Sequence, residues 1–263
     1  MIRLPSIPLP PKTASALVQL QRRVNVAGPY SIQVDSAQRE FHTRNKAHDP
    51  VFRVVRRVLR KMCSGAARCG YCEDSAADEV EHFRPKTLYP ELAFAWTNYL
   101  YACGPCNGTA KNNQFAVLPP RGRIPVVVTR PRGAKVKRPR AGLSALIDPR
   151  QENMLDFLEI DLQTGVVNPR LGLSARDRAR AEYTLDTLRL NRDPLPQARL
   201  EQLDAYLARL VRYTTLAKSK RATWISKLQH AQHPAVWREM QRQHMMYGEL
   251  ARLFGSTPSA LGW

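Results

Sequence analysis

The segments "RCGYCEDSAADEVEHFRPK" (residues 68–86) and "WTNYLYACGPCNGTAK" (residues 96–111) decide the fold of this 263-residue chain. Each contains one Cys-x-x-Cys pair, and the four cysteines are Cys69, Cys72, Cys103 and Cys106. Four thiolates in two tight pairs are the soft ligands that tetrahedral zinc prefers. We therefore expect one structural Zn²⁺ bound by these four residues, with a set of free thiols as the alternative.

Other features of the chain predict a cytoplasmic protein without a membrane partner. It has no run of eighteen apolar residues, and its first residues, "MIRLPSIPLPPK", lack the apolar core of a signal peptide. In a reducing compartment, cysteines in close pairs favour metal binding over disulfides. Cys63 stands apart from the pairs, and we expect a small, partly buried apolar residue there; substitution for a neighbouring zinc ligand stays open.

The charge of the chain is strongly positive. Lys and Arg number 41 against 22 Asp and Glu, a formal net charge of +19. Such an excess favours a polyanionic partner, and we expect nucleic acid. A membrane surface is the weaker alternative, because no stretch sets a clean Lys/Arg face against Trp, Phe and Leu.

The pattern of residues predicts an α+β chain that is mainly helical, in four regions. Residues 1–66 form an N-terminal helical region, and residues 67–118 form the metal-bearing module. Residues 119–150 form a basic, Pro-rich linker or hairpin around a β-like stretch at 124–129. Residues 151–263 form a C-terminal helical region with one short β-hairpin.

In the N-terminal region we expect two helices. Thr13 or Ser15 caps the first, which ends near Gly28, and the second spans residues 37–62. Apolar residues recur at helical spacing in the second helix, at Val51, Val54, Val55, Val58 and Leu59. Arginines lie on its other face, as a solvated surface or as phosphate contacts: Arg53, Arg56, Arg57 and Arg60.

In the C-terminal region, "FLEIDLQTGVV" alternates in hydrophobicity, and Thr164 and Gly165 suit the turn of a hairpin. Ser174 is placed to cap the helix that follows. A later helix carries an apolar stripe at Leu200, Leu203, Leu207, Leu210 and Val211, which indicates packing in a helical bundle.

The residues between the two cysteine pairs carry chemistry that zinc does not explain. "DEVEHF" alternates like a strand, so Glu81 and His82 face opposite sides and serve different partners. Asn107 follows Cys106 directly, and Lys111 comes about one helical turn later. A turn leading into a helix would aim Asn107 at the space that His82 occupies, and such a helix start suits a phosphate.

These residues resemble a known family. "CGYCE…EHFRPK…YPELAFAWTNYLYACGPCN…K" resembles an HNH endonuclease with zinc-stabilised ββα-metal architecture. It is most similar to the HNH effector nucleases of Septu-type and retron-associated antiphage systems. The likeness covers residues 68–115, and a looser likeness extends over "LIDP" and "TLDTLRLNRDPLPQAR".

The resemblance implies a role for each motif residue. His82 is the general base, and Asn98 holds the loop that carries it. Asn107 and Glu81 bind one catalytic divalent cation, Mg²⁺ or Mn²⁺. Many HNH proteins have Asp at the position of Glu81, and the longer side chain bears on the geometry of the metal. Oxygen ligands suit such a hard cation, whereas the four thiolates suit zinc.

The resemblance also implies hydrolysis of phosphodiester bonds in DNA by an antiphage effector, with an ATPase subunit as possible regulator. Phosphate contacts are expected from the basic residues near the motif, Arg84, Lys86 and Lys111. Two other hypotheses stay open: a non-catalytic zinc module that binds nucleic acid, and an interaction subunit with a degenerate HNH site.

Overall fold

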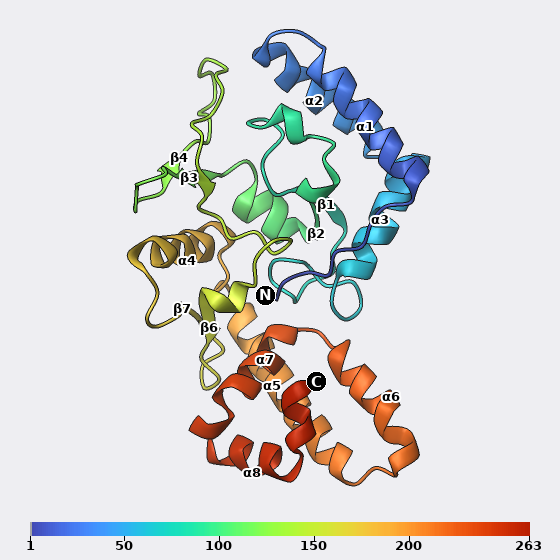
Figure 1. Cartoon of the computed structure of the whole chain (residues 1–263), viewed down its shortest axis with the longest axis vertical. Helices are drawn as coiled ribbons and strands as arrows, with labels where there is room; N and C mark the ends of the chain where they lie inside the picture. The colour runs from blue at the N-terminus through green and yellow to red at the C-terminus, as the bar shows by residue number, and fades with distance from the viewer. Residues whose placement is uncertain (1) are drawn as a thin grey trace.

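The computed structural model describes residues 2–263 and confirms an α+β chain dominated by helices, with three small antiparallel sheets (Figure 1). Three N-terminal helices lie along one side: α1 (Pro11–Asn25), α2 (Tyr30–Arg44) and α3 (Pro50–Met62). Within the described residues, no helix is both long and apolar enough to cross a membrane.

The prediction of one helix over residues 37–62 is wrong, because α2 ends at Arg44 and a separate helix, α3, begins at Pro50. Asp49 caps α3 by accepting hydrogen bonds from the backbone N–H groups of Val51 and Phe52, at 2.9 and 3.0 Å. The start predicted for α1 is also wrong, because α1 begins at Pro11, a residue pre-organised for the first helical position.

The apolar face of α3 packs into the N-terminal core. The buried residues of the helix are Phe52, Val55, Val58, Leu59 and Met62, while Arg53, Arg57 and Arg60 are exposed. This face meets aromatic side chains of the central module, such as Tyr99 and Phe94. The α3 helix thereby supports one face of the central hairpin.

The central hairpin pairs β1 (Glu79–His82) with β2 (Tyr99–Ala102) in antiparallel register, so that Glu81 lies opposite Leu100. The connection contains the 3₁₀ turns η1 (Pro90–Leu92) and η2 (Trp96–Asn98). After β2 the chain enters the short π-type helix η3 (Pro105–Lys111). Strand, strand and helix thus follow one another as a ββα unit.

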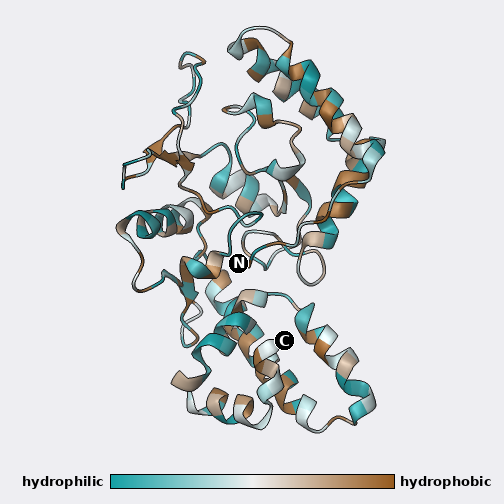
Figure 2. Cartoon of the chain, in the orientation of Figure 1, coloured by the Kyte–Doolittle hydropathy of each residue, from teal (hydrophilic) through white to brown (hydrophobic). Residues whose placement is uncertain are grey.

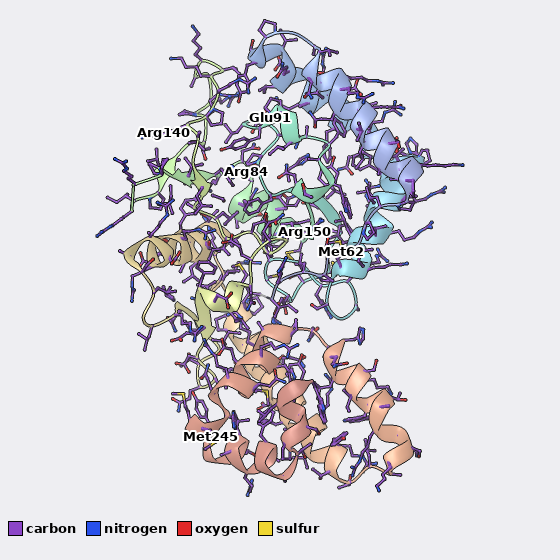
Figure 3. The ribbon with its side chains drawn as sticks, viewed as in Figure 1. Met62, Arg84, Glu91, Arg140, Arg150 and Met245 are labelled. Carbon is purple, nitrogen blue, oxygen red and sulfur yellow. The ribbon has the colours of Figure 1, made fainter. Side chains whose placement is uncertain are left out.

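The basic region is built into a three-stranded sheet. There β3 (Ala116–Leu118) lies between β4 (Val126–Val127) and β5 (Leu143–Ser144), all antiparallel. Figure 2 shows this sheet as a hydrophobic patch of ribbon. Residues 128–142 form the loop from β4 to β5, and Arg140 in this loop is exposed. Figure 3 shows Arg140 at the side of the molecule, whereas Arg84 lies near its centre.

A second hairpin follows the 3₁₀ turn η4 (Met154–Asp156) and pairs β6 (Leu158–Ile160) with β7 (Val167–Pro169). Gly165 in its turn has φ +70°, a conformation that glycine adopts readily. The predicted hairpin and its turn are therefore confirmed.

Five helices follow this hairpin, and α5 to α8 form the lower part of Figure 1, below α4. They are α4 (Ala175–Leu188), α5 (Leu195–Thr214), α6 (Lys218–Gln229), α7 (Pro234–Gln243) and α8 (Gly248–Ser256), with short 3₁₀ turns η5 (His244–Met246) and η6 (Pro258–Gly262). Ser174 caps α4, as predicted. The stripe predicted on α5 is only partly right, because Val211 is exposed and the polar Gln202 is buried.

Candidate active site and four-cysteine centre

The four cysteines of the two pairs converge, as the sequence predicted. All four are buried, and their sulfur atoms lie within 4.8 Å of one another. The Sγ atoms of Cys72 and Cys103 are 3.9 Å apart. Tetrahedral zinc with Zn–S bonds of about 2.3 Å places its sulfur ligands about 3.8 Å apart. The centre therefore fits a structural metal such as zinc.

Hydrogen bonds surround this centre. Arg192, in the turn between α4 and α5, donates from Nη2 to Cys106 Sγ at 3.2 Å, and the backbone N–H of Tyr71 donates to Cys69 Sγ at 3.4 Å. Such donors orient metal ligands and moderate their charge. No sequence pattern pointed to Arg192, which is 86 residues from Cys106. Cys63 lies outside the cluster, and its thiol donates a hydrogen bond to Leu59 O.

The predicted alternation of β1 is confirmed. His82 joins Phe41 and Tyr99 on the side of the N-terminal helices, whereas Glu81 faces Tyr71 and Lys111. A cavity of about 510 Å³ at the edge of β1 brings together several of the predicted site residues. Its lining includes Glu81, His82, Lys86 and Asn107.

A single backbone carbonyl orients the imidazole of His82. Nε2 lies 2.9 Å from Ala93 O, and the hydroxyl of Tyr99 donates to the same oxygen at 2.7 Å. Because a carbonyl only accepts, Nε2 carries the proton and Nδ1 of the neutral ring keeps its lone pair. Burial, followed by the charge of Lys86, lowers the pKa of His82 well below its usual value, which favours this neutral form.

Asn98 clamps the segment that follows β1. Its Oδ1 accepts from the N–H of Arg84 at 2.8 Å, and its Nδ2 donates to Arg84 O and Leu92 O, both at 3.0 Å. The side chain is only 5% exposed, so these bonds are shielded from water. This geometry suits the loop-holding role expected of Asn98.

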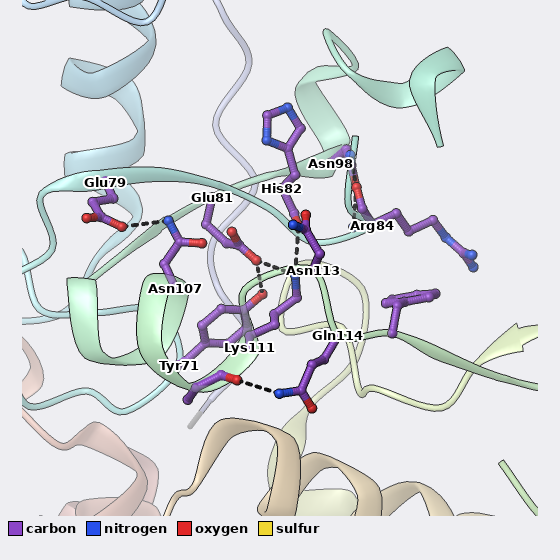
Figure 4. A network of polar contacts seen from close by, with 12 residues as sticks. Tyr71, Glu79, Glu81, His82, Arg84, Asn98, Asn107, Lys111, Asn113 and Gln114 are labelled. Atoms are coloured by element: carbon purple, nitrogen blue, oxygen red, sulfur yellow. Dashed lines mark hydrogen bonds and ion pairs between the residues drawn. The ribbon is translucent and has the colours of Figure 1, made fainter. Parts of the chain in front are cut away.

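Glu81 is held by a buried ammonium (Figure 4). Nζ of Lys111 lies 2.5 Å from Glu81 Oε1 and donates to His82 O at 2.9 Å, and the Lys111 side chain is fully buried. Burial raises the pKa of Glu81, while Lys111 acts to lower it. Lys111 was predicted to contact phosphate, but here its ammonium is enclosed and holds β1 and Glu81 instead.

Asn107 reaches the same cavity from η3. Its Nδ2 donates to Glu79 Oε2 at 2.6 Å, and Figure 4 shows its side-chain oxygen turned toward Glu81. Glu79 was missed in the sequence, although the two-residue period that placed Glu81 also places Glu79 on the same face of β1. Two carboxylates and an amide oxygen are a donor set that suits a hard divalent cation.

The two predicted phosphate contacts after His82 separate in space. Lys86 lines the cavity, with Nζ 4.8 Å from the ring centre of Phe41. Arg84 instead lies over the rings of Tyr89 and Phe115, at 5.0 and 5.2 Å, and lines a different cavity. Arg56 of α3, one of the four arginines offered above as possible phosphate contacts, also lines the cavity and donates to Lys46 O at 3.0 Å.

Comparison with known proteins finds partial similarity. The chain is 38% identical over 80 residues to the Septu protein PtuB of Bacillus mycoides (strain KBAB4), covering 24% of this chain and 26% of that protein. It is 48% identical over 46 residues to the Septu protein PtuB of Bacillus thuringiensis, covering 16% of this chain and 18% of that protein. No protein-family model matches the chain. The similarity thus spans about a quarter or less of either relative.

Proposed function

We propose that this chain is a metal-dependent HNH endonuclease that hydrolyses phosphodiester bonds in DNA as the effector of an antiphage defence system. The observation that carries the proposal is the arrangement of one cavity. It brings a neutral, oriented imidazole, His82, to the same space as the oxygen donors Glu81 and Asn107. The partial similarity to Septu PtuB proteins supports the same function.

In this proposal each residue has a separate task. Nδ1 of His82 takes the proton from the attacking water, and Asn98 keeps that ring in place through the segment after β1. Glu81, Asn107 and Glu79 would hold Mg²⁺ or Mn²⁺. The cation, when bound, neutralises charge on the phosphate. Lys86 lies on the same wall and contacts a phosphate oxygen.

DNA binding is proposed from charge. The loop of residues 128–142 presents exposed basic side chains at Arg132, Lys135, Lys137, Arg138 and Arg140. Contacts of this kind bind the phosphate backbone with little dependence on base sequence. A nuclease that cuts DNA without sequence preference would damage the cell's own DNA, so its activity would have to be regulated. We propose that an ATPase subunit is this regulator.

One observation favours the alternative of a non-catalytic zinc module that binds nucleic acid. Lys111 already neutralises Glu81, so this carboxylate needs no cation to be stable in its buried place. Supercoiled plasmid incubated with the purified protein distinguishes the two. The nuclease nicks or linearises the plasmid with Mg²⁺ or Mn²⁺ and not without them, whereas the binding module retards it in a gel and leaves it intact under every condition.

A further inference from the structure

A second cavity, of about 720 Å³, lies between the C-terminal helices and the loop that precedes the four-cysteine centre. It shares no lining residue with the cavity of the candidate active site. The loop contributes Arg68, and α5 contributes Gln202 and Arg209, two turns apart on one helix face. Helix α6 contributes Trp224 and Lys227.

The lining contains buried hydrogen-bond donors that lack an acceptor. Among the described residues, five buried side-chain polar atoms have no hydrogen-bond partner. Three of the five belong to residues of this cavity: Arg68 Nε, Gln202 Nε2 and Arg209 Nη1. Gln202 is only 4% exposed. Because buried polar groups in folded proteins nearly always have partners, three such donors in the lining of one cavity indicate an acceptor that binds there.

The charge of the cavity shows what kind of acceptor fits. Its lining includes the cations Arg68, Arg209 and Lys227, and no Asp or Glu among the residues that the structure describes. The neighbouring carboxylates are engaged elsewhere. Glu73 accepts from the N–H groups of Ile2 and Ala235, and Asp74 contacts His233 and Ser75. The donors therefore face a space of positive potential, which suits an anion.

An aromatic wall stands beside these donors. The indole of Trp224 donates from Nε1 to Arg209 O at 2.9 Å, which fixes the ring next to the Arg209 backbone. Lys227 Nζ lies 5.9 Å from the centre of the same ring. A cavity of this size is in the range that encloses a small organic ligand. The wall suits a ligand with a flat ring as well as an anionic group.

We propose that this cavity binds a phosphorylated small molecule of nucleotide size. Its phosphate accepts hydrogen bonds from Arg68, Gln202 and Arg209, and its base lies against Trp224. The proposal does not depend on nuclease activity, because none of these residues lines the candidate active site. A phosphate of bound DNA has the same chemistry, so the test includes a DNA arm.

The test is calorimetric titration of the full-length, metal-loaded protein with AMP, inorganic phosphate and adenosine. We expect AMP to bind, phosphate to bind more weakly, and adenosine to bind at least about tenfold more weakly than AMP, since it lacks the charge-assisted hydrogen bonds. If neither AMP nor phosphate binds the wild-type protein, the proposal is wrong, however the variants behave. The cavity would then hold only water.

Variants locate the site. Arg209→Met should weaken AMP binding about tenfold or more. The matched control, Arg212→Met, removes the same charge from an exposed position of α5 and should leave binding unchanged. Gln202→Leu should also weaken AMP binding and raise the melting temperature, because it removes a buried donor that has no acceptor. Equal effects of Arg209→Met and Arg212→Met contradict the assignment.

The DNA arm uses a short duplex. Arg209→Met should bind the duplex like Arg212→Met, and the duplex should not displace AMP. If the duplex displaces AMP and binds Arg209→Met at least tenfold more weakly than Arg212→Met, the cavity holds a DNA phosphate and the small-molecule proposal is wrong.

Discussion

The guanidinium of Arg192 donates a hydrogen bond to the sulfur of Cys106, at 3.2 Å, and so joins the C-terminal region to the four-cysteine centre. Arg192→Met should keep the fold and the bound zinc but weaken zinc affinity about 10- to 100-fold, the usual effect of losing a partner of a metal ligand. Competition with a chromophoric chelator measures this affinity. Arg178→Met, an exposed change on α4, is the control. Equal zinc affinity in both variants would show that the Arg192 hydrogen bond is incidental.

Loss of a cysteine should be more severe than loss of Arg192. Cys69→Ser or Cys106→Ser removes a ligand from a buried cluster, and structural zinc contributes about 10 kcal/mol or more to the folding of small modules. We expect both proteins to lose zinc and become protease-sensitive within residues 67–118. Cys63→Ser, outside the cluster, should keep its zinc. Elemental analysis that finds no zinc in the folded wild-type protein contradicts this prediction.

The hydrogen bond between Glu79 and Asn107 leads to a prediction on metal dependence. Glu79→Ala removes a proposed oxygen donor to the cation and frees the amide of Asn107 to rotate, so the Mg²⁺ or Mn²⁺ concentration for half-maximal cleavage should rise about tenfold or more. Asn107→Ala should act in the same direction, because it removes an oxygen donor. Asp78→Ala removes a neighbouring carboxylate that also lines the cavity but that is not bonded to Asn107, and it should have a smaller effect. The measurement is plasmid cleavage over a metal titration, and unchanged metal dependence in Glu79→Ala would remove Glu79 from the site.

The exposed basic loop should supply DNA affinity by binding phosphates. Replacing Arg132, Lys135, Lys137 and Arg140 by Gln should weaken binding and lower the slope of log affinity against log salt by up to about 3.6, or about 0.9 for each phosphate that is no longer neutralised. Replacing Lys218 and Lys220 at the start of α6, at the opposite end of Figure 1, is the control. If affinity and slope stay unchanged in the loop variant, the loop is a linker or a protein-binding surface.

Asp148 gives a prediction on pH. Burial raises the pKa of Asp148 to about 6, although the N–H of Arg150 donates to its Oδ1. A raised pKa means that the native state binds the proton more tightly, so ionisation of Asp148 costs stability as pH rises from about 4 to 6. Asp148→Asn keeps an oxygen acceptor for Arg150 and should be more stable than wild type by about 1–3 kcal/mol above pH 6. Denaturant unfolding at pH 4 and pH 7 measures the difference, which should vanish at pH 4; a constant difference contradicts the assignment.

The sequence predicted those parts of the site that depend on local pattern. Two Cys-x-x-Cys pairs indicated the four-cysteine centre, and the period of a strand placed Glu81 and His82 on opposite faces. The same period, applied to every residue of "DEVEHF", also places Glu79 on the face of Glu81. The catalytic roles of these residues stay predictions.

Other features depend on tertiary packing, which local pattern does not carry. Arg84 follows the end of β1, where Asn98 sets the direction of the chain, and it stacks on Tyr89 and Phe115 outside the cavity. Burial of Lys111 and the approach of Arg192 involve elements far apart in sequence. The error over residues 37–62 has a different cause. Asp49 and Pro50 are a helix-start signal in the sequence, but the spacing of apolar residues does not mark where the helix begins.

Single-turnover cleavage of supercoiled plasmid by His82→Ala tests the central claim most directly. His42→Ala, an exposed histidine of α2, is the matched control. His82→Ala should keep zinc content and DNA affinity while the rate falls at least ~100-fold at every Mg²⁺ or Mn²⁺ concentration, because the base that takes the proton from water is lost. Asn98→Ala should fall between His82→Ala and wild type. Metal-dependent cleavage by His82→Ala at the wild-type rate would contradict the HNH mechanism proposed for this cavity.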